Sequence, residues 1–91
     1  MRNKEYKSQQ YQKAYEQHHG QCVECGCRAS QIAHRIPQRK WLIKKYSFEV
    51  INHHLNLYPA CCLRCNALLQ ARQWEWDVLA EEIKKEIKKN D

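Results

Sequence analysis

Two pairs of closely spaced cysteines constrain this chain more than any other feature of its sequence. Cys22 and Cys25 form the first pair, Cys62 and Cys65 form the second, and residues 26–61 separate the two pairs. Two intervening residues let both thiolates of a pair lie on one turn, and two such turns supply the four sulfur ligands of a tetrahedral zinc site. The spacing therefore predicts a structural Zn²⁺ ion held by these four residues.

The length of the chain is consistent with a fold that needs a metal. Its 91 residues form one domain, and the hydrophobic core of so short a chain gives marginal stability on its own. Residues 1–21 contain no apolar segment of signal-peptide length, and no apolar stretch is long enough to span a bilayer. We therefore expect a cytoplasmic protein, in which thiols stay reduced and bind metal instead of forming disulfides.

Two further cysteines, Cys27 and Cys61, lie directly beside the two pairs. Either of them is an alternative ligand. Cys27 could bind together with Cys25 in the first pair, and Cys61 could bind together with Cys65 in the second. The regular two-residue spacing favours the ligand set given above. Cys27 and Cys61 are then expected to be ordinary buried cysteines that pack as small hydrophobic side chains.

Apolar spacing predicts an α+β fold with a helix at each end of the chain. Tyrosines and small residues recur at helical spacing in a predicted N-terminal helix within residues 1–20, which Gly20 ends. Apolar residues recur every three or four positions in residues 73–91, with acidic residues first and lysines last, which predicts an amphipathic helix. Residues 22–72 between them are expected to form the zinc-stabilised core.

Shorter elements are predicted within this core. An alternating segment at 32–36 predicts a strand that Pro37 ends. The other segments are a short helix or ordered excursion at 38–46, extended stretches at 48–51 and 55–57, and a helix at 66–72.

The charge of the chain favours a polyanionic partner. Sixteen lysines and arginines against ten acidic residues give a net charge of +6. Much of the positive charge follows the predicted strand, and each such side chain can neutralise a phosphate. These residues are Arg35, Arg39, Lys40, Lys44 and Lys45. Trp41 among them and Trp74 further on are either core residues or surfaces on which an unpaired base stacks.

A histidine and two asparagines complete a recognisable pattern with the cysteines. His34 stands in Ala-His-Arg-Ile-Pro, Asn56 in His-Leu-Asn-Leu-Tyr-Pro, and Asn66 directly follows Cys65. Over roughly Cys22 to Leu69, the chain resembles the HNH, or ββα-metal, endonuclease superfamily in the order and spacing of these residues. The Cys-x2-Cys-Asn ending is similar to the phage recombination endonuclease VII branch.

The resemblance implies a fold, a reaction and a set of roles. The fold is a ββα-metal core, and the reaction is hydrolysis of phosphodiester bonds in DNA. His34 is implied to be the general base that activates water, Asn56 to brace the hairpin, and Asn66 to bind a catalytic Mg²⁺ or Mn²⁺ ion through its amide oxygen.

One position departs from the family pattern. Ala33 stands where the family usually has Asp or His as a second ligand of the catalytic metal. Either His53 or His54 replaces that ligand, or Asn66 and water hold the metal weakly, or catalysis has been lost. The stretch between Asn56 and Cys62 is also one residue longer than usual.

Three functions are therefore weighed from the sequence. The first is a metal-dependent DNA endonuclease. The second is a catalytically degenerate zinc module that binds nucleic acid or a protein without cleaving it. The third is a zinc-stabilised adaptor that forms a homodimer through its tyrosine-rich and C-terminal helices.

Overall fold

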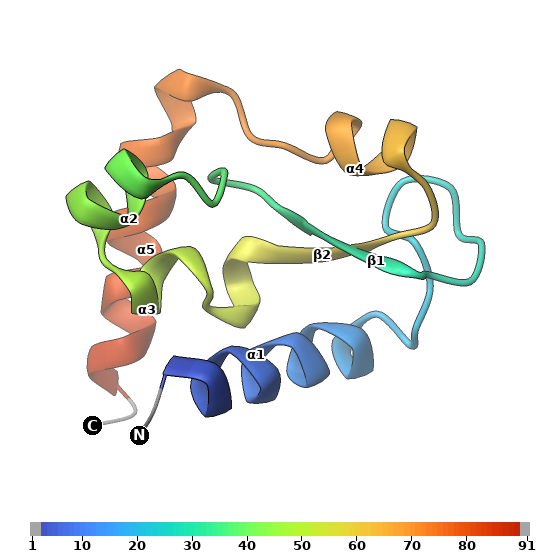
Figure 1. The fold of residues 1–91 in the computed structure, drawn as a ribbon, viewed down its shortest axis with the longest axis horizontal. Helices are drawn as coiled ribbons and strands as arrows, with labels where there is room; N and C mark the ends of the chain where they lie inside the picture. Colours follow the sequence, from blue (N-terminus) through green and yellow to red (C-terminus); the bar gives the residue numbers. More distant parts are fainter. Residues whose placement is uncertain (1–2, 90–91) are drawn as a thin grey trace.

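Two short antiparallel strands lie at the centre of the molecule (Figure 1). The computed structural model describes residues 3–89. Strand β1, Gln31–His34, pairs with β2, Leu57–Ala60, so that Ile32 faces Pro59 and His34 faces Leu57 across the pair. Pro59 cannot donate to the ladder, which a two-stranded sheet tolerates because each strand has a free edge.

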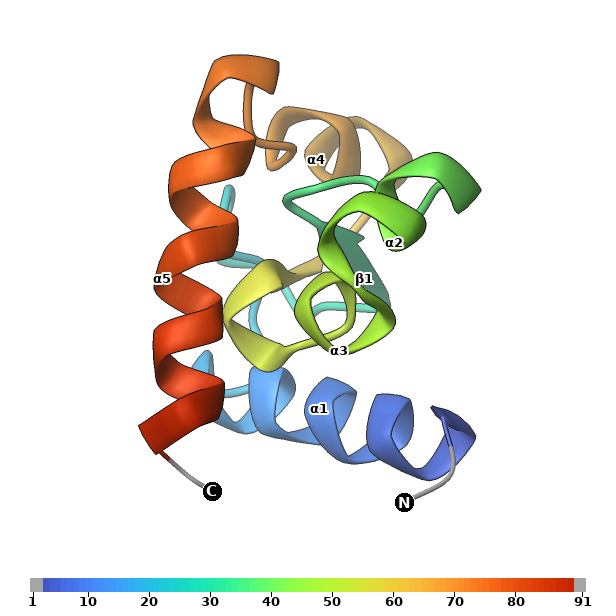
Figure 2. The ribbon, with the colours of Figure 1, turned by 90° about the vertical axis from the view of Figure 1, so that its left-hand side faces the viewer.

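A helix covers each face of this hairpin. Helix α1, Asn3–Gln17, lies along one face, and α4, Leu63–Leu68, lies against the other, with the strands between them in both views (Figures 1 and 2). Since side chains alternate between the two faces of a strand, Gln31 and Ala33 belong to one face of β1, and Ile32 and His34 to the other.

Tyrosine hydroxyls attach α1 to the rest of the chain. Tyr6 donates to the backbone oxygen of Glu49 at 2.8 Å, and Tyr15 donates to that of Gln31 at 3.4 Å. The helix ends as predicted before Gly20, which has a φ of 68° and is easily accommodated there because it lacks a Cβ. The tyrosine-rich face is therefore used within the chain.

The main hydrophobic core lies at the end of the molecule away from the cysteines. It is built by α2, Lys40–Tyr46, α3, Phe48–Ile51, and α5, Trp76–Lys89, with Leu55 of the short 3₁₀ segment η1, His54–Asn56, packed against it. A second 3₁₀ segment, η2, Gln73–Glu75, precedes α5. The fully or almost fully buried members of this core are Ile36, Leu42, Tyr46, Val50, Ile51, Leu79, Ala80 and Ile83. Figure 2 shows α5 running along the side of the molecule.

The expected α+β composition is confirmed, but some segments differ from expectation. Residues 48–51 form a helix instead of an extended stretch, because the Ser47 hydroxyl accepts from the Val50 amide at 3.3 Å and caps the turn. Residues 54–56 form a 3₁₀ turn, with β2 starting only at Leu57. Helix α4 begins three residues earlier than expected, so Asn66 lies inside it.

The two terminal helices lie within the ranges expected for them. The expected ranges 1–20 and 73–91 extend into residues 1–2 and 90–91, which lie outside the described part of the chain. Within residues 3–89, no helix combines the length and the apolar character that crossing a membrane requires.

Candidate functional site

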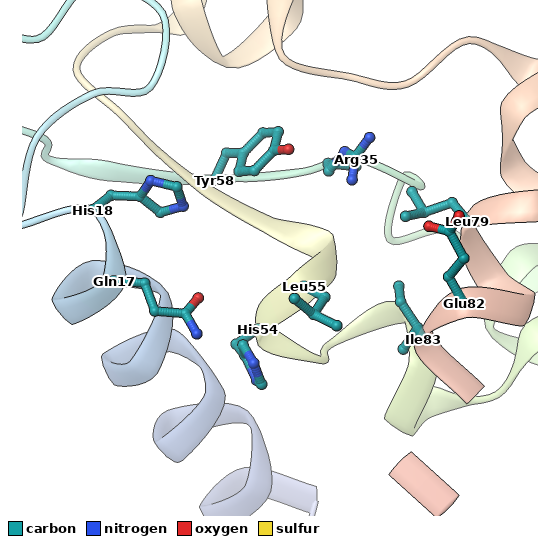
Figure 3. A pocket seen from close by; sticks show the side chains of 9 residues that line it. All are labelled: Gln17, His18, Arg35, His54, Leu55, Tyr58, Leu79, Glu82 and Ile83. Atoms are coloured by element: carbon teal, nitrogen blue, oxygen red, sulfur yellow. The ribbon is translucent and has the colours of Figure 1, made fainter. Parts of the chain in front are cut away.

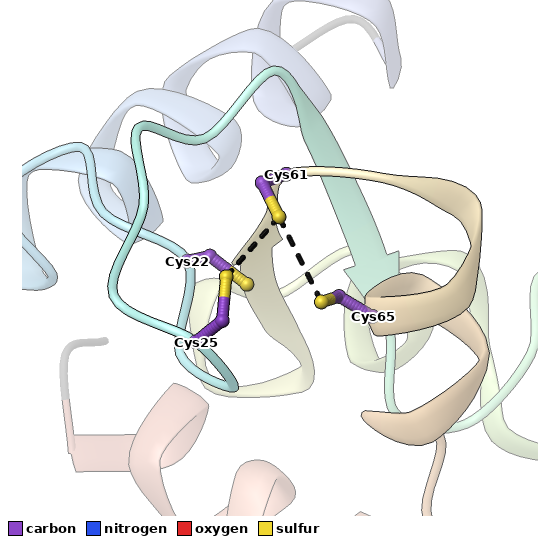
Figure 4. Close-up of side chains that lie close together, drawn as sticks. All are labelled: Cys22, Cys25, Cys61 and Cys65. Atoms are coloured by element: carbon purple, nitrogen blue, oxygen red, sulfur yellow. Dashed lines mark hydrogen bonds between the residues drawn. The ribbon is translucent and has the colours of Figure 1, made fainter.

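Four cysteine sulfurs gather where the chain leaves α1 and where it enters α4 (Figure 4). The cysteine cluster consists of Cys22, Cys25, Cys61 and Cys65, whose Sγ atoms all lie within 4.8 Å of one another. The Sγ atom of Cys61 lies 3.2 Å from that of Cys25 and 3.7 Å from that of Cys65. The cluster therefore joins the turn after α1 to the end of β2 and the start of α4.

The local backbone geometry positions the sulfur atoms of Cys22 and Cys25. The amide of Cys22 donates to the Cys27 oxygen at 2.7 Å, and the amide of Gly26 donates to the Cys22 oxygen at 2.9 Å, which closes a tight turn. Gly26 has a φ of 81°, a conformation that glycine adopts without steric cost. Both sulfurs of the pair are thereby held on one side of the turn.

The electrostatics of the cluster favour a bound cation. Although burial opposes it, hydrogen bonds from the backbone of Cys25, Glu24 and Cys61 lower the pKa of Cys22 to about 6. Hydrogen bonding with Cys25 and Cys65 instead raises the pKa of the Cys61 thiol. The thiols of the cluster thus oppose one another's ionisation in the bare protein, whereas a coordinated cation deprotonates its thiol ligands.

The cluster fits a zinc ion in both chemistry and size. Zinc favours four thiolates in a tetrahedron with Zn–S distances of about 2.3 Å, which separates the sulfurs by about 3.8 Å. The separations of the Cys61 sulfur from those of Cys25 and Cys65, 3.2 and 3.7 Å, approach that value. The four residues could thus hold a metal such as zinc without rearrangement of the fold.

The second half of this ligand set corrects the expectation from spacing. Cys61 contributes the sulfur that Cys62 was expected to contribute. Cys62 is the N-cap of α4 and has extended backbone angles, φ −157° and ψ 171°. Cys62 lies outside the group of four and is exposed, although its thiol is within hydrogen-bonding reach of the thiols of Cys61 and Cys65.

The expectation that Cys27 and Cys61 are ordinary buried cysteines is also corrected. Cys61 is a member of the cysteine cluster, and Cys27 is exposed on the surface of the turn. Neither is a buried hydrophobic residue of the kind expected.

His34 is the last residue of β1, and its ring lies on the α1 face of the hairpin. Its Nε2 atom lies 3.1 Å from Oδ1 of Asn52 and 3.4 Å from the Tyr11 hydroxyl. Burial lowers the pKa of His34 below 6.5, and the charge of Lys7 acts in the same direction, while hydrogen bonds with Asn52 and Gln38 oppose the shift. His34 is therefore neutral at pH 7 and able to accept a proton.

Asn56 is fully buried and ties three backbone groups together. Its Oδ1 accepts from the amide of Ile36 at 2.8 Å, and its Nδ2 donates to the oxygens of Ile36 at 3.1 Å and Ile51 at 2.7 Å. These bonds fix the chain just beyond His34 to the segment that precedes β2. The side chain thus braces the end of the hairpin at which residues 35–56 connect the two strands.

Asn66 lies on the opposite face of the hairpin from His34. From α4, its Nδ2 donates to Oε1 of Gln31 at 3.1 Å and to the Ile32 oxygen at 3.4 Å. Ala33 is fully buried on this same face, among Cys22, Ala60 and Cys65. The structure therefore does not bring His34 and Asn66 together on one face, and it leaves no space for a larger side chain at Ala33.

His53 and His54 lie on the α1 side and do not approach Asn66. Nδ1 of His54 lies 2.8 Å from Oε1 of Gln10 in α1, and the two imidazole rings stack with centroids 4.2 Å apart. Burial, with the charges of His54 and Lys13, lowers the pKa of His53 to about 4. Among residues 3–89, the cysteines are the only group of three or more Cys, His, Asp or Glu side chains placed to share a metal.

The five basic residues named from the sequence fall into two places. Arg39, Lys40, Lys44 and Lys45 are exposed at α2, where Lys45 lies 3.7 Å from Asp77 of α5. Arg35 follows β1, and its guanidinium lies over the ring of Tyr58, 5.0 Å from the centroid. The four residues at α2 form the α2 basic patch.

Arg35 also borders a cavity of about 320 Å³ between α1, the hairpin and α5. Figure 3 shows His18, His54 and Tyr58 around it, with Glu82 on the α5 side. Basic and acidic side chains share this lining, so it carries no single sign of charge.

The tryptophans differ in their surroundings. Trp76 is half-buried against the main core, and Trp41 is about half-exposed with its ring centroid 6.1 Å from that of Trp76. Trp74 is 72% exposed, with the guanidinium of Arg72 over its ring. Trp74 is therefore the tryptophan with the most open face.

Two of the side chains that contact the His34 ring, Tyr11 and Asn52, were not expected from the sequence. Tyr11 lies 23 positions before His34 and Asn52 lies 18 positions after it. No local pattern marks a contact across such separations, although Asn52 stands in an unusually polar Asn-His-His segment between apolar runs.

Comparison of the chain with known protein families, with curated proteins and with solved structures finds no match.

Proposed function

We propose that this chain is a zinc-stabilised endonuclease of the HNH type, which hydrolyses phosphodiester bonds in DNA. The observation that carries the proposal is the cysteine cluster, which joins the turn after α1 to the end of β2 and to α4, at one end of the β1–β2 hairpin. We take His34, at the end of the first strand, and Asn66, inside the helix that follows the second strand, as the residues that correspond to the HNH pattern in the sequence.

His34 is the proposed general base. A neutral imidazole takes a proton from water as the water attacks phosphorus, and a histidine with a lowered pKa is in that form near pH 7. Tyr11 and Asn52 both contact the Nε2 atom of the ring, which limits its rotation. Asn56 supports the same site by fixing the backbone that follows it.

Asn66 is the one residue proposed to contact a catalytic cation. Its Nδ2 is used by Gln31 and Ile32, so its amide oxygen is the atom that a hard cation would meet. A bound Mg²⁺ or Mn²⁺ would neutralise charge that grows on the scissile phosphate. Ala33 is buried and has no atom that could bind a cation. The single amide oxygen of Asn66 therefore fits such an ion only where water and a DNA phosphate supply the other ligands.

DNA is the proposed partner of the α2 basic patch. Three of its four cations, Arg39, Lys40 and Lys44, are exposed and have no carboxylate partner among the ion pairs of residues 3–89. Contacts of this kind with phosphates release counterions, so the binding should weaken steeply as salt rises.

The proposal is tested by incubating the zinc-loaded protein with supercoiled plasmid and Mg²⁺ or Mn²⁺. We expect nicked and then linear DNA, and we expect His34→Ala to abolish cleavage while it retains zinc. The matched control is His19→Asn, an exposed histidine with a φ of 55° that asparagine accepts. Equal cleavage by wild type and His34→Ala would reject His34 as the base.

A specific observation favours a second candidate, a zinc module that binds nucleic acid without cleaving it. Ala33 is buried where the family pattern has a metal ligand, and His34 and Asn66 lie on opposite faces of the hairpin. Salt-sensitive DNA binding without cleavage under either cation would support this candidate over the first.

A further inference from the structure

Asn52 is a fully buried polar residue whose side chain points at the proposed base. It is the C-cap of α3, where its backbone amide donates to the Phe48 oxygen at 3.0 Å. Its side-chain Nδ2 donates to that same oxygen at 3.3 Å, and its Oδ1 lies 3.1 Å from Nε2 of His34. Both ends of the amide are therefore occupied.

These contacts determine which way the amide faces. A carbonyl oxygen accepts hydrogen bonds and does not donate them, so the Phe48 oxygen must meet the Nδ2 end of Asn52. The oxygen end then meets His34, where it too is only an acceptor. A neutral imidazole carries one proton, and this contact requires that proton to be on Nε2.

The proton on Nε2 has a consequence for the other ring nitrogen. With Nε2 protonated, Nδ1 of His34 keeps its lone pair and is the atom able to accept a proton. The Tyr11 hydroxyl, 3.4 Å from Nε2, is compatible with this form because its oxygen can accept from the same N–H.

We propose that Asn52 is a positioning residue that holds His34 in the Nε2–H tautomer and so directs Nδ1 toward the water to be activated. The use of Nδ1 in catalysis rests on the proposed function, whereas the tautomer itself does not. The role is indirect, because Asn52 acts through His34 and touches no reacting atom.

The first test reads the tautomer directly and requires no activity. The full zinc-loaded chain is labelled with ¹⁵N-histidine, His34 is assigned from the signal missing in His34→Gln, and long-range ¹H–¹⁵N correlations identify the protonated nitrogen near pH 7.5. We expect His34 to carry its proton on Nε2. A proton on Nδ1, or an average of the two tautomers, would overturn the proposal whether or not the protein cuts DNA.

Two substitutions then separate Asn52 from Tyr11. Asn52→Leu keeps the branched side-chain skeleton but removes the acceptor, and we expect the His34 signals to move to an average of both tautomers. Tyr11→Phe is the matched control and should keep the Nε2–H form. The unchanged tautomer in a folded Asn52→Leu variant would contradict the assignment.

A third variant changes the charge at the same position. Asn52→Asp places a carboxylate beside Nε2, which stabilises the imidazolium, so the pKa of His34 should rise above that of the wild type. The charged and titratable groups facing the ring are otherwise Lys7 and Tyr11 of α1, and both stay in place. A pKa of His34 that does not rise in Asn52→Asp would count against the contact.

The outcomes distinguish this inference from the proposed function. The Nε2–H tautomer together with a protein that fails to cut DNA would retain the role of Asn52 in orienting His34 and reject the nuclease. Cleavage by a protein whose His34 is protonated on Nδ1 would retain the nuclease and reject the role of Asn52. In an active protein, the lower end of the pH–rate profile should move to higher pH in Asn52→Asp.

Discussion

The Sγ atom of Cys61 lies 3.2 Å from that of Cys25, so the end of β2 and the turn after α1 meet at the cysteine cluster. The buried side chains around this contact are small, with Ala33 and Ala60 beside Cys22 and Cys65, and only Tyr58 and Leu69 add larger, partly buried side chains. Little apolar area is buried at this end of the molecule compared with the core between α2, α3 and α5. The stability of the hairpin end should therefore depend on a metal.

The first prediction separates two neighbouring cysteines. Cys61→Ser should lose its zinc, because it removes one of the four sulfurs of the cysteine cluster, whereas Cys62→Ser should keep one zinc per chain. Zinc content measured by mass spectrometry of the metal, after purification without chelator, gives the answer. Loss of zinc from Cys62→Ser with retention in Cys61→Ser would restore the ligand set expected from the two-residue spacing.

Removal of the metal should unfold at least the cysteine end of the molecule. Zinc binding contributes on the order of 10 kcal/mol to the folding of small zinc domains, which exceeds the stability expected of so short a chain. A strong chelator should therefore lower the melting temperature seen by circular dichroism, and added Zn²⁺ should reverse the change. Identical melting curves with and without chelator would show that the fold does not depend on the ion.

Asn56→Ala should destabilise the fold by about 2 to 4 kcal/mol, because it leaves buried backbone groups of Ile36 and Ile51 without their partners. Asn66→Ala is the matched control. The Asn66 side chain is half-buried and makes longer hydrogen bonds, so its removal should lower the free energy of unfolding by about 1 kcal/mol or less. Urea denaturation monitored by tryptophan fluorescence measures both, and equal losses would mean that Asn56 has no special bracing role.

His53 should make stability fall as the pH falls. Its pKa is about 4 in the folded chain against an ordinary 6.5, so the unfolded chain binds the proton first, and folding is opposed progressively from about pH 6.5 down to about pH 4. His53→Gln removes this contribution. The difference in unfolding free energy between wild type and His53→Gln, measured at several pH values with excess zinc, should change in favour of the variant as the pH drops; a difference that stays constant would contradict the prediction.

Charge at the α2 basic patch should determine affinity for DNA. Lys44→Ala should weaken binding and reduce the slope of log K against log salt by about 1. Lys45→Ala should have a smaller effect, since Lys45 lies 3.7 Å from Asp77 and part of its charge is already balanced. Fluorescence anisotropy with a labelled duplex at several salt concentrations measures both slopes, and equal effects of the two substitutions would contradict the role of Asp77.

The sequence predicted the features that depend on residues close to one another in the chain. The pair Cys22 and Cys25 lies on one turn, and the terminal helices follow from apolar spacing and from Gly20. The choice between Cys61 and Cys62 depends on the residue at which β2 ends and α4 begins, and a shift of one residue reverses the direction of a side chain.

Other features depend on contacts that spacing does not encode. The helix at 48–51 is short and is stabilised by the Ser47 cap and by burial of Val50 and Ile51 against α5. The approach of Asn52 to His34 requires α3 and β1 to be packed against each other. Neither relationship leaves a periodic signal in the sequence.

The placement of His34 and Asn66 on opposite faces of one hairpin limits what can touch both at once. The strand and its buried alanine stand between them, so a small metabolite seated on either side would meet only one of the two. A molecule that reaches both must pass around the end of the hairpin, and a flexible polymer with repeated anionic groups has the length to do so.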